Sequence, residues 1–212
     1  MSARYPVMLD VSRLSVLVVG GGEVALRRVR GLVEAGGRPR IVAPEVHPEL
    51  LEIVRQHGLE WRARAYEEGD GYECDLVFAA TGSRQVNERV RRQAMDDGAL
   101  YDVADDPRHS TFHVPAAIRQ GEVVVAFSTG GASPLLARRL RERLEAVVTP
   151  GLGRAARRLA AARDEVRGRW PDDEARRREA WFGLVTPEFL DAAIEGRDAD
   201  VEHRISACLS QS

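Results

Sequence analysis

The stretch Val16-Leu-Val-Val-Gly20-Gly21-Gly22-Glu23-Val24-Ala25-Leu26-Arg27-Arg28 decides the fold of this chain. It predicts a β-branched strand that runs through three glycines into a helix. Gly20, Gly22 and Ala25 fit the pattern G-x-G-x-x-G/A of dinucleotide-binding βαβ units. In that pattern a pyrophosphate binds at the N-terminus of the helix, where backbone N–H groups are free. The alternative is a tight turn without a ligand, which does not require three consecutive glycines.

The composition is typical of a globular enzyme. The chain has 212 residues, 44% of them hydrophobic, and its net charge of −2 argues against nucleic acid as a partner. All 31 basic residues are arginine. Cys74 and Cys208 lie far apart and predict neither a disulfide framework nor a zinc site. The sequence contains no apolar run long enough for a membrane span and no evident signal peptide, so we expect a cytoplasmic protein.

The first half of the chain alternates strands and helices. Strands are predicted at about 15–20, 39–43, 59–65, 75–80 and 100–103, and helices at about 23–35, 46–57 and 84–97. Such alternation predicts an α/β fold, a doubly wound parallel sheet with helices on both faces, which ends near residue 112.

The second half of the chain has a different pattern. A strand at 122–128 is expected to be central in a sheet. Ser133 and Pro134 predict the N-cap and first residue of a helix that runs to about residue 147. Residues 152–212 contain no strand pattern and predict arginine-rich helices broken at prolines. Interleaved acidic residues favour a solvated, salt-bridged surface on these helices over RNA binding.

Several motifs, met in the same order, resemble one family. They are Pro6-Val-Met-Leu-Asp10, the glycine stretch, Ala79-Ala-Thr81, Val86-Asn87, Val103-Ala-Asp105, Phe112-x-x-Pro115-Ala116 and Ser128-Thr-Gly-Gly-Ala-Ser-Pro134-x-Leu-Ala-Arg138-x-Leu-Arg141. The chain resembles the precorrin-2 dehydrogenases of siroheme synthesis, which oxidise precorrin-2 to sirohydrochlorin with NAD; some also insert ferrous iron. The resemblance implies an NAD-binding domain at 1–112, a dimerisation segment at 113–150 that builds a homodimer, and a C-terminal helical domain at 151–212.

Asp105 is the residue to which the resemblance assigns catalysis. It follows the strand predicted at 100–103, at the edge of the sheet where doubly wound folds bind ligands. The oxidation removes a hydride and a proton from the macrocycle, and a carboxylate is a suitable proton acceptor. From the residues alone, Asp105-Asp106-Pro107 is equally good turn sequence. Asp102 departs from the family, which usually has asparagine there. It either raises the proton affinity of Asp105 or points into the sheet and needs a hydrogen-bond partner.

The residues expected to bind NAD lie at three predicted strand ends. They are Gly20, Gly21, Gly22, Glu23, Val24, Ala25, Pro44, Glu45 and Thr81. The resemblance implies the contacts of Glu23-Val24 and Pro44-Glu45. Many NAD enzymes bind the ribose diol through an acid at the end of the second strand, and Glu45 is the first acid there. Its charge would repel a 2′-phosphate and no arginine follows closely, which favours NAD over NADP.

A second anion-binding segment is predicted at Thr129, Gly130, Gly131 and Ser133, just before the helix that carries Arg138. The family's substrate carries many carboxylates, so the resemblance implies that these residues bind it. The alternative is a helix capped in the ordinary way by Ser133 and followed by Pro134.

No metal site built from protein side chains is expected. His109 and His113 have the i, i+4 spacing of metal ligands, but an extended segment at 112–115 would separate the rings, and the sequence offers no third ligand nearby. If ferrous iron is a substrate, the tetrapyrrole supplies the nitrogen ligands. The competing function is a non-catalytic NAD-binding regulatory module. That function explains the glycines but gives Asp105 and the helix at Ser133-Pro134 no task.

Overall fold

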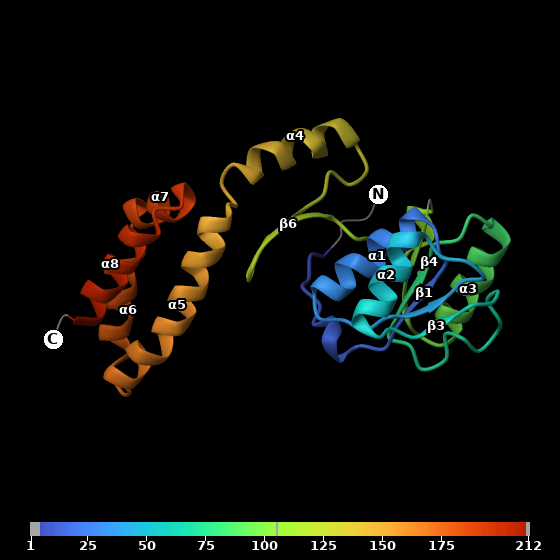
Figure 1. Ribbon diagram of the computed structural model, residues 1–212, viewed down its shortest axis with the longest axis horizontal. Helices are drawn as coiled ribbons and strands as arrows, with labels where there is room; N and C mark the ends of the chain where they lie inside the picture. The colour runs from blue at the N-terminus through green and yellow to red at the C-terminus, as the bar shows by residue number, and fades with distance from the viewer. Residues whose placement is uncertain (1–4, 105, 211–212) are drawn as a thin grey trace. The chain divides into compact units, whose positions relative to one another are not determined.

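The computed structural model describes residues 5–104 and 106–210 of the chain (Figure 1). The chain divides into two compact units, Met1–Val114 and Pro115–Ser212, and each has a hydrophobic core of its own. Within the described residues, none of the helices is both long and apolar enough to cross a membrane.

The first unit is built on a parallel sheet. Among the described residues its strands lie in the order β3-β2-β1-β4-β5. Their bounds are Val16–Val19 (β1), Arg40–Val42 (β2), Trp61–Arg62 (β3), Leu76–Ala79 (β4) and Leu100–Val103 (β5). Because β1 pairs with both β2 and β4, the strand order reverses between β1 and β4. The predicted doubly wound α/β fold is therefore confirmed.

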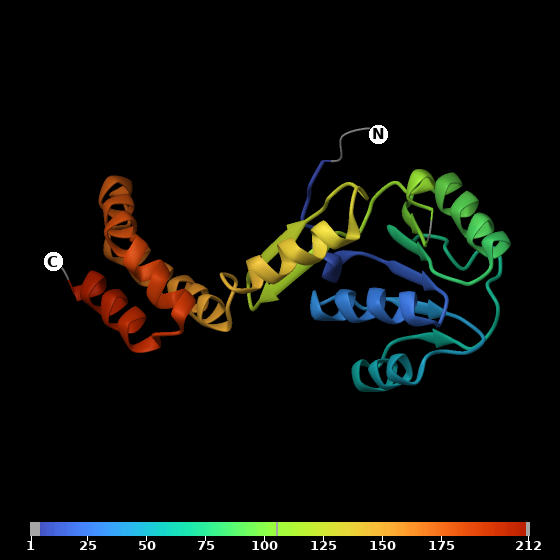
Figure 2. The ribbon, with the colours of Figure 1, turned by 90° about the horizontal axis from the view of Figure 1, so that it is seen from above.

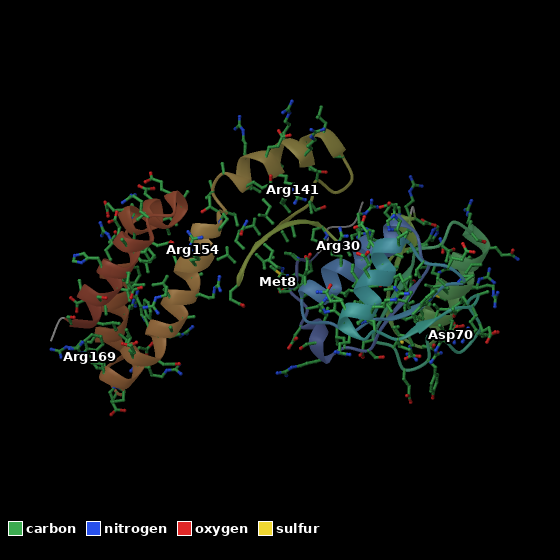
Figure 3. All side chains as sticks on the ribbon, in the orientation of Figure 1. Met8, Arg30, Asp70, Arg141, Arg154 and Arg169 are labelled. Carbon is green, nitrogen blue, oxygen red and sulfur yellow. The ribbon has the colours of Figure 1, made fainter. Side chains whose placement is uncertain are left out.

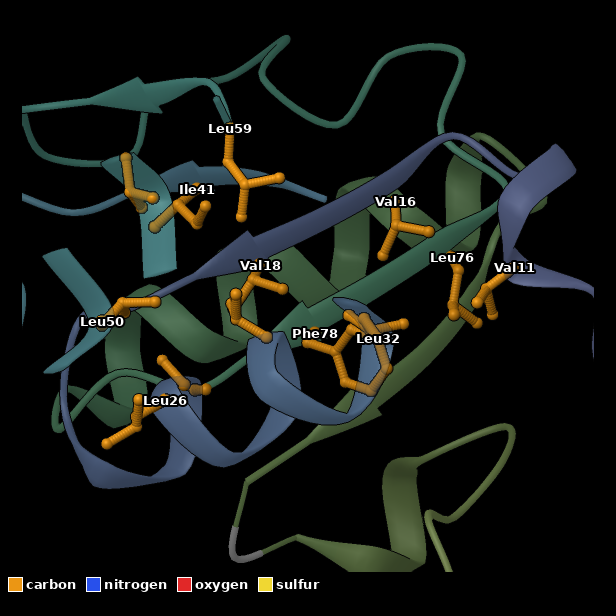
Figure 4. Packing of buried hydrophobic residues seen from close by; sticks show 14 residues of the cluster. Val11, Val16, Val18, Leu26, Leu32, Ile41, Leu50, Leu59, Leu76 and Phe78 are labelled. Atoms are coloured by element: carbon orange, nitrogen blue, oxygen red, sulfur yellow. The ribbon is translucent and has the colours of Figure 1, made fainter. Parts of the chain in front are cut away.

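Helices cover both faces of this sheet. Their bounds are Glu23–Glu34 (α1), Pro48–His57 (α2) and Arg84–Asp96 (α3). Successive strand residues point to opposite faces, so the apolar strands supply two cores, one shared with α1 and α2 and the other with α3. Figure 4 shows Leu26 of α1 and Leu50 of α2 near Val18, with Leu32 of α1 beside Phe78. This burial fixes the strand ends that carry the candidate site.

The strand predicted at 59–65 is shorter than expected. β3 ends at Arg62 because the Arg64 N–H turns back to the Arg62 carbonyl oxygen, at 2.9 Å. Both arginines donate to the buried carboxylate of Asp70 over 2.6–2.8 Å. The Arg64 bonds, more than those of Arg62, hold the pKa of Asp70 well below its ordinary value despite the burial. The chain after β3 is thus a loop closed by charge-assisted hydrogen bonds.

The second unit begins with an antiparallel hairpin. β6 (Ala116–Gln120) pairs with β7 (Val123–Phe127), and in the part of the chain that the structure describes these two strands form a separate sheet. The expectation of a central strand at 122–128 is therefore wrong. Only Gly121, with φ +60°, and Glu122 connect β6 to β7, and so short a connection forces antiparallel pairing.

Helices form the rest of the second unit. Their bounds are Pro134–Glu145 (α4), Pro150–Arg169 (α5), Glu174–Leu184 (α6), Pro187–Glu195 (α7) and Asp198–Ser210 (α8). α4 packs along the hairpin (Figure 2), and α5 to α8 enclose an apolar cluster that includes Ala162, Ala192 and Ile205. A Ser or Thr N-cap followed by proline starts α4, α5 and α7. The predicted C-terminal helical region is confirmed.

Candidate functional site

The carboxyl edge between β1 and β4 is where a sheet of this order binds ligands. Gly20 follows β1, and Ala80 and Thr81 follow β4, its parallel neighbour. β2 lies on one side of this pair and β5 on the other. The fold therefore brings the predicted cofactor residues after β1, β2 and β4 to one edge of one sheet.

The three glycines of the turn differ in their surroundings. Gly20 has φ +127°, and a Cβ on it would lie 2.3 Å from the Ala80 carbonyl oxygen. A Cβ on Gly21 would lie 1.9 Å from the Glu45 carbonyl oxygen, a contact that the motif does not predict. No described atom lies within 4 Å of a Cβ built on Gly22, so the space beside that residue is open.

The first turn of α1 keeps its N–H groups available. α1 starts after Gly22 with no side-chain cap among the described residues, whereas a side chain caps each of α2 to α7. The positive end of the helix dipole lies at the same place. Ala25 is fully buried against the sheet, which its small side chain allows. This end of α1 therefore fits an anionic group such as a pyrophosphate.

The loop after β2 is bound to the glycine turn by His47. Its N–H donates to the Gly21 carbonyl oxygen at 2.7 Å, and its Nδ1 caps α2 by accepting from the Glu49 N–H at 3.3 Å. Because Nδ1 is an acceptor, the ring proton is on Nε2, which lies 3.3 Å from Glu23 Oε1. The segment 44–45 of this loop is exposed. His47 connects two of the predicted cofactor segments, and no sequence motif indicated it.

The loop after β4 lies against the glycine turn from the other side. A Cβ on Gly20 would lie 3.1 Å from the Thr81 backbone nitrogen. Ser83 ends the loop as the N-cap of α3, where its Oγ accepts from the Val86 N–H at 3.3 Å. The side chain of Asn87, on α3, is buried against Thr81. The motif Val86-Asn87 carried the resemblance, but its residues alone gave no role for Asn87.

Asp105, the predicted catalytic residue, lies outside the described residues. On either side of it, Ser110 Oγ accepts from the Val103 N–H at 2.9 Å and donates to the Asp106 carbonyl oxygen at 3.0 Å. The Asp106 carboxylate lies 2.8 Å from His109 Nδ1, and this bond lowers the pKa of Asp106. Among the described side chains, no three His, Cys, Asp or Glu residues are arranged to hold a metal ion.

Asp102 points into the first unit and has a partner. Its side chain, 8% exposed, accepts a hydrogen bond from Arg28 Nη2 at 2.9 Å. The Arg28 guanidinium also lies 5.9 Å from the centre of the Phe78 ring. Of the two alternatives for this departure from the family, the geometry favours the one in which Asp102 needs a partner. The pair connects α1 to β5.

The segment predicted to bind anions in the second unit forms a glycine turn ahead of a capped helix. Gly130 and Gly131 have φ of +62° and +82°, in the left-handed region. Ser128 Oγ accepts from the Gly130 N–H at 3.1 Å, and Ser133 Oγ caps α4. This local structure agrees both with a ligand site and with a helix capped in the ordinary way, so it does not distinguish the two interpretations.

Arg138, Arg139 and Arg141 of α4 are exposed and paired with glutamates of the same helix. Arg138 Nε lies 3.2 Å from Glu142 Oε1. Arg141, which Figure 3 labels on α4, has its Nε 2.7 Å from Glu145 Oε1. Surface pairs of this i, i+4 kind contribute little to stability. A ligand carboxylate could therefore replace the glutamate at small cost.

Comparisons with known proteins agree with this geometry. The family model described as "Putative NAD(P)-binding" matches residues 7–116, more than half of the chain. A second model, described as "Sirohaem biosynthesis protein central", matches residues 125–146. The chain belongs to this NAD(P)-binding family, and the predicted dinucleotide cofactor is confirmed.

The most similar relatives include several siroheme synthases. That of Chromobacterium violaceum is 39% identical over 209 residues, which cover 96% of this chain and 44% of that protein. That of Nitrosomonas europaea is 35% identical over 208 residues, 98% of this chain and 44% of that protein. The chain thus spans less than half the length of these relatives. A solved structure, the precorrin-2 dehydrogenase SirC, is 27% identical with a TM-score of 0.79, covering 96% of this chain and 100% of that one. The family that the motifs resemble is therefore confirmed.

Proposed function

We propose that this member of the NAD(P)-binding family oxidises precorrin-2 to sirohydrochlorin, with NAD as the hydride acceptor, in siroheme synthesis. The observation that carries the proposal is the similarity to a precorrin-2 dehydrogenase over nearly the whole chain. In the reaction the macrocycle loses a hydride to the cofactor and a proton to a base, so the protein must bind two ligands and accept one proton.

The first unit fits the cofactor. The uncapped start of α1 and the open space beside Gly22 suit the pyrophosphate, whose oxygens would accept bonds from free N–H groups. When bound, NAD supplies the site that receives the hydride. His47, in the loop after β2, binds the glycine turn on the side where the adenosine would lie. Thr81 lies against the turn on the side of β4.

The cofactor should be NAD rather than NADP. Glu45 is exposed in the loop after β2, where it can bind a ribose diol and repel a 2′-phosphate. We therefore expect kcat/KM to be at least about tenfold higher with NAD, a difference that one charged contact can produce. Steady-state rates with each cofactor test this. Equal values would show that Glu45 does not face the ribose.

Asp105 is the base of this proposal. As a carboxylate it would take the proton that leaves the macrocycle when the hydride is transferred. Support comes from its position in the sequence two residues after β5, a strand whose carboxyl end lies at the ligand-binding edge, and from the motif Val103-Ala-Asp105 that carries the resemblance. Asp102, already paired with Arg28, is not needed for this step.

The second unit would bind the carboxylates of the substrate. Thr129, Gly130, Gly131 and Ser133 carry hydroxyl and N–H groups before α4, of which the Gly130 N–H already donates to Ser128 Oγ, and Arg138 follows on the helix. Arginine binds carboxylates through paired hydrogen bonds. In this proposal substrate carboxylates exchange with Glu142, the present partner of Arg138.

The partner of this chain would be a second copy of itself. Several large apolar side chains on and just after α4 are exposed: Leu135, Leu136, Leu140 and Val147. The hairpin beside this helix also buries few of its apolar residues. Exposed apolar side chains grouped on one element are typical of an interface. A homodimer formed through this part of the second unit would cover them.

Incubating the protein with precorrin-2 and NAD tests the proposed function. Sirohydrochlorin absorbance and NADH should appear together in equal amounts. NAD binding without turnover would instead favour the regulatory module. Ferrous iron insertion, which the resemblance allows as a further step with iron as substrate, is assayed separately by adding Fe²⁺ to sirohydrochlorin. Iron insertion and the cytoplasmic location both stay predictions.

A further inference from the structure

One buried amide bonds to every polar group of Thr81, the second residue after β4. Asn87 Oδ1 accepts from the Thr81 N–H at 3.1 Å and from Thr81 Oγ1 at 2.7 Å. Asn87 Nδ2 donates to the Thr81 carbonyl oxygen at 3.0 Å. The Asn87 side chain is well shielded from water, since the residue is 6% exposed. These three bonds fix both the backbone and the hydroxyl of Thr81.

No other side chain of similar size could make the same three bonds. The Thr81 N–H requires an acceptor and its carbonyl requires a donor, and only an amide offers both at one end. Aspartate would place an acceptor against the carbonyl oxygen, and leucine would leave both backbone groups without partners in a shielded place. The geometry therefore also settles which end of the Asn87 amide carries the oxygen.

Thr81 lies at the cofactor edge, on the side away from the adenosine loop. Its nitrogen is 3.1 Å from the position of a Cβ on Gly20, whereas the Glu45 carbonyl approaches the turn at Gly21. The adenosine ribose is expected after β2, so the nicotinamide half of the dinucleotide extends toward β4 and β5. Asn87 therefore fixes the loop that faces the nicotinamide half.

We infer that Asn87 is a positioning residue that acts through Thr81 on the nicotinamide half of NAD. Its side chain is buried on α3 and bonded to Thr81, so it acts without touching the cofactor. The inference rests on the proposed use of NAD. It does not need turnover of precorrin-2, since binding alone reveals it.

Two ligands separate the halves of the cofactor. ADP-ribose contains the adenosine and the pyrophosphate but lacks the nicotinamide ring. For Asn87→Ala, measured by titration calorimetry on the full chain, we expect NAD to bind about tenfold more weakly, as the loss of a fixed loop contact would produce. ADP-ribose should bind within about twofold of wild type, because α1 and the loop after β2 are unchanged.

Gln93→Ala is the matched control. Gln93 lies on the same helix and its amide also binds a loop, by accepting from the Gly69 N–H at 3.0 Å and from the Tyr66 hydroxyl. That loop follows β3 and carries none of the proposed cofactor residues. The control should reduce thermal stability much as Asn87→Ala does, and should leave the affinities for NAD and ADP-ribose unchanged.

The outcomes are distinct. Equal weakening of both ligands by Asn87→Ala, or weakening of neither, would overturn the inference, as would selective loss of NAD affinity in Gln93→Ala. If Asn87→Ala does not fold, Asn87→Asp takes its place: it keeps the bonds that Oδ1 accepts but sets an acceptor against the Thr81 carbonyl oxygen, so NAD should again be weakened more than ADP-ribose. A protein that binds NAD as described but does not oxidise precorrin-2 would refute the proposed function and leave this inference standing.

Discussion

The two units of this chain bury their strands to different degrees. Every residue of β1 and β4 is buried, because helices cover both faces of the parallel sheet. Among the described residues of β6 and β7, by contrast, only Ile118 is buried. A two-stranded hairpin has too few strands to form a core by itself. The comparison teaches that the sheet of the first unit is covered on both faces by its own helices, whereas the hairpin of the second unit is only partly covered. The proposed second copy would pack there.

Arginine also has different roles in the two units. In the first, Arg64 donates to an almost fully buried carboxylate, that of Asp70. In the second, pairs such as Arg158 with Glu202 lie at the surface, where solvent screens them. We therefore expect the stability of the first unit to fall more than that of the second when the pH becomes acid. The surface ion pairs of the second unit should exchange partners more readily.

The largest effect that we expect separates chemistry from cofactor binding. Asp105→Ala should lower kcat for precorrin-2 oxidation by about 10²–10⁴-fold, the usual contribution of general acid–base catalysis. The dissociation constant for NAD should not change, because in the proposed function the glycine turn and α1 bind the pyrophosphate. Steady-state kinetics and an NAD titration measure the two quantities.

Asp106→Ala is the control for that variant. Asp106 is bonded to His109 at 2.8 Å, and the proposed base is the preceding residue, so the loss of Asp106 should cost far less turnover. A thermal melt on each variant checks that both fold. Near wild-type oxidation by Asp105→Ala would reduce Asp105 to a turn residue and reject the catalytic assignment.

The next effect tests whether the second unit needs a partner. Leu136→Arg puts a charge on an α4 side chain that is 50% exposed, and should raise the dissociation constant of the homodimer about 100-fold. Leu190→Arg is the control, since this leucine of α7 is similarly exposed, at 44%. Sedimentation velocity at several concentrations measures both. NAD affinity should survive in the Leu136→Arg monomer, because the first unit is complete by itself; a wild-type chain that is monomeric would reject the homodimer.

A smaller effect concerns acid pH and the first unit. The Asp70 side chain is 2% exposed and its pKa is lowered, mainly by its bonds to Arg64. A carboxyl group with a lowered pKa in the folded state stabilises the protein above its ordinary pKa, and this contribution is lost as the pH falls through the folded value. Asp70→Asn should therefore cost about 2 kcal/mol of unfolding free energy at pH 7, and this difference from wild type should shrink below about pH 4.

Urea titrations at neutral and acid pH measure that difference. Glu202→Gln, which removes the surface partner of Arg158, is the control and should shift the urea midpoint little at either pH. A cost for Asp70→Asn that stays constant down to acid pH would mean that the carboxylate charge does not stabilise the first unit.

Local patterns predicted the elements that depend on neighbours in the sequence. The strand, glycine turn and helix at Val16–Glu34 follow from backbone freedom and periodicity, and Ser133-Pro134 begins a helix as its capping chemistry requires. The hairpin was missed because an apolar run at 122–128 looks the same in a central strand and in a half-covered one. Which strand such a run pairs with, and which residues pack over it, depend on the rest of the fold.

For the candidate site too, the sequence predicted local motifs but not the contacts that folding creates. The glycines could be named from their motif, but the need for Gly21 arises from the Glu45 carbonyl, which reaches it only in the folded chain. Asn87 and His47 act through residues that folding brings beside them, and no spacing in the sequence encodes those contacts. Asn87 stands in a motif that carried the resemblance, but the motif does not say which residue its side chain contacts.

The smallest effect tests the ion pair that connects α1 to β5. Asp102→Asn keeps an oxygen that can accept from Arg28 Nη2, and the guanidinium keeps its place over the Phe78 ring, so only the charge is lost. We expect a cost of about 1 kcal/mol, seen as a melting temperature about 4 °C lower. Turnover should stay within about twofold of wild type, because the general base of the proposal is a different carboxylate.

Asp102→Ala is the stronger test of this pair, because it removes the carboxylate partner of the partly buried Arg28 guanidinium. It should cost about 3 kcal/mol, more than the asparagine variant, while the KM for NAD stays the same. If Asp102→Asn instead lost turnover tenfold or more with an unchanged melt, the carboxylate would take part in proton transfer. The first unit would then hold two cooperating acids at the end of β5, and the Arg28 pair would serve to tune the chemistry rather than to join helix and strand.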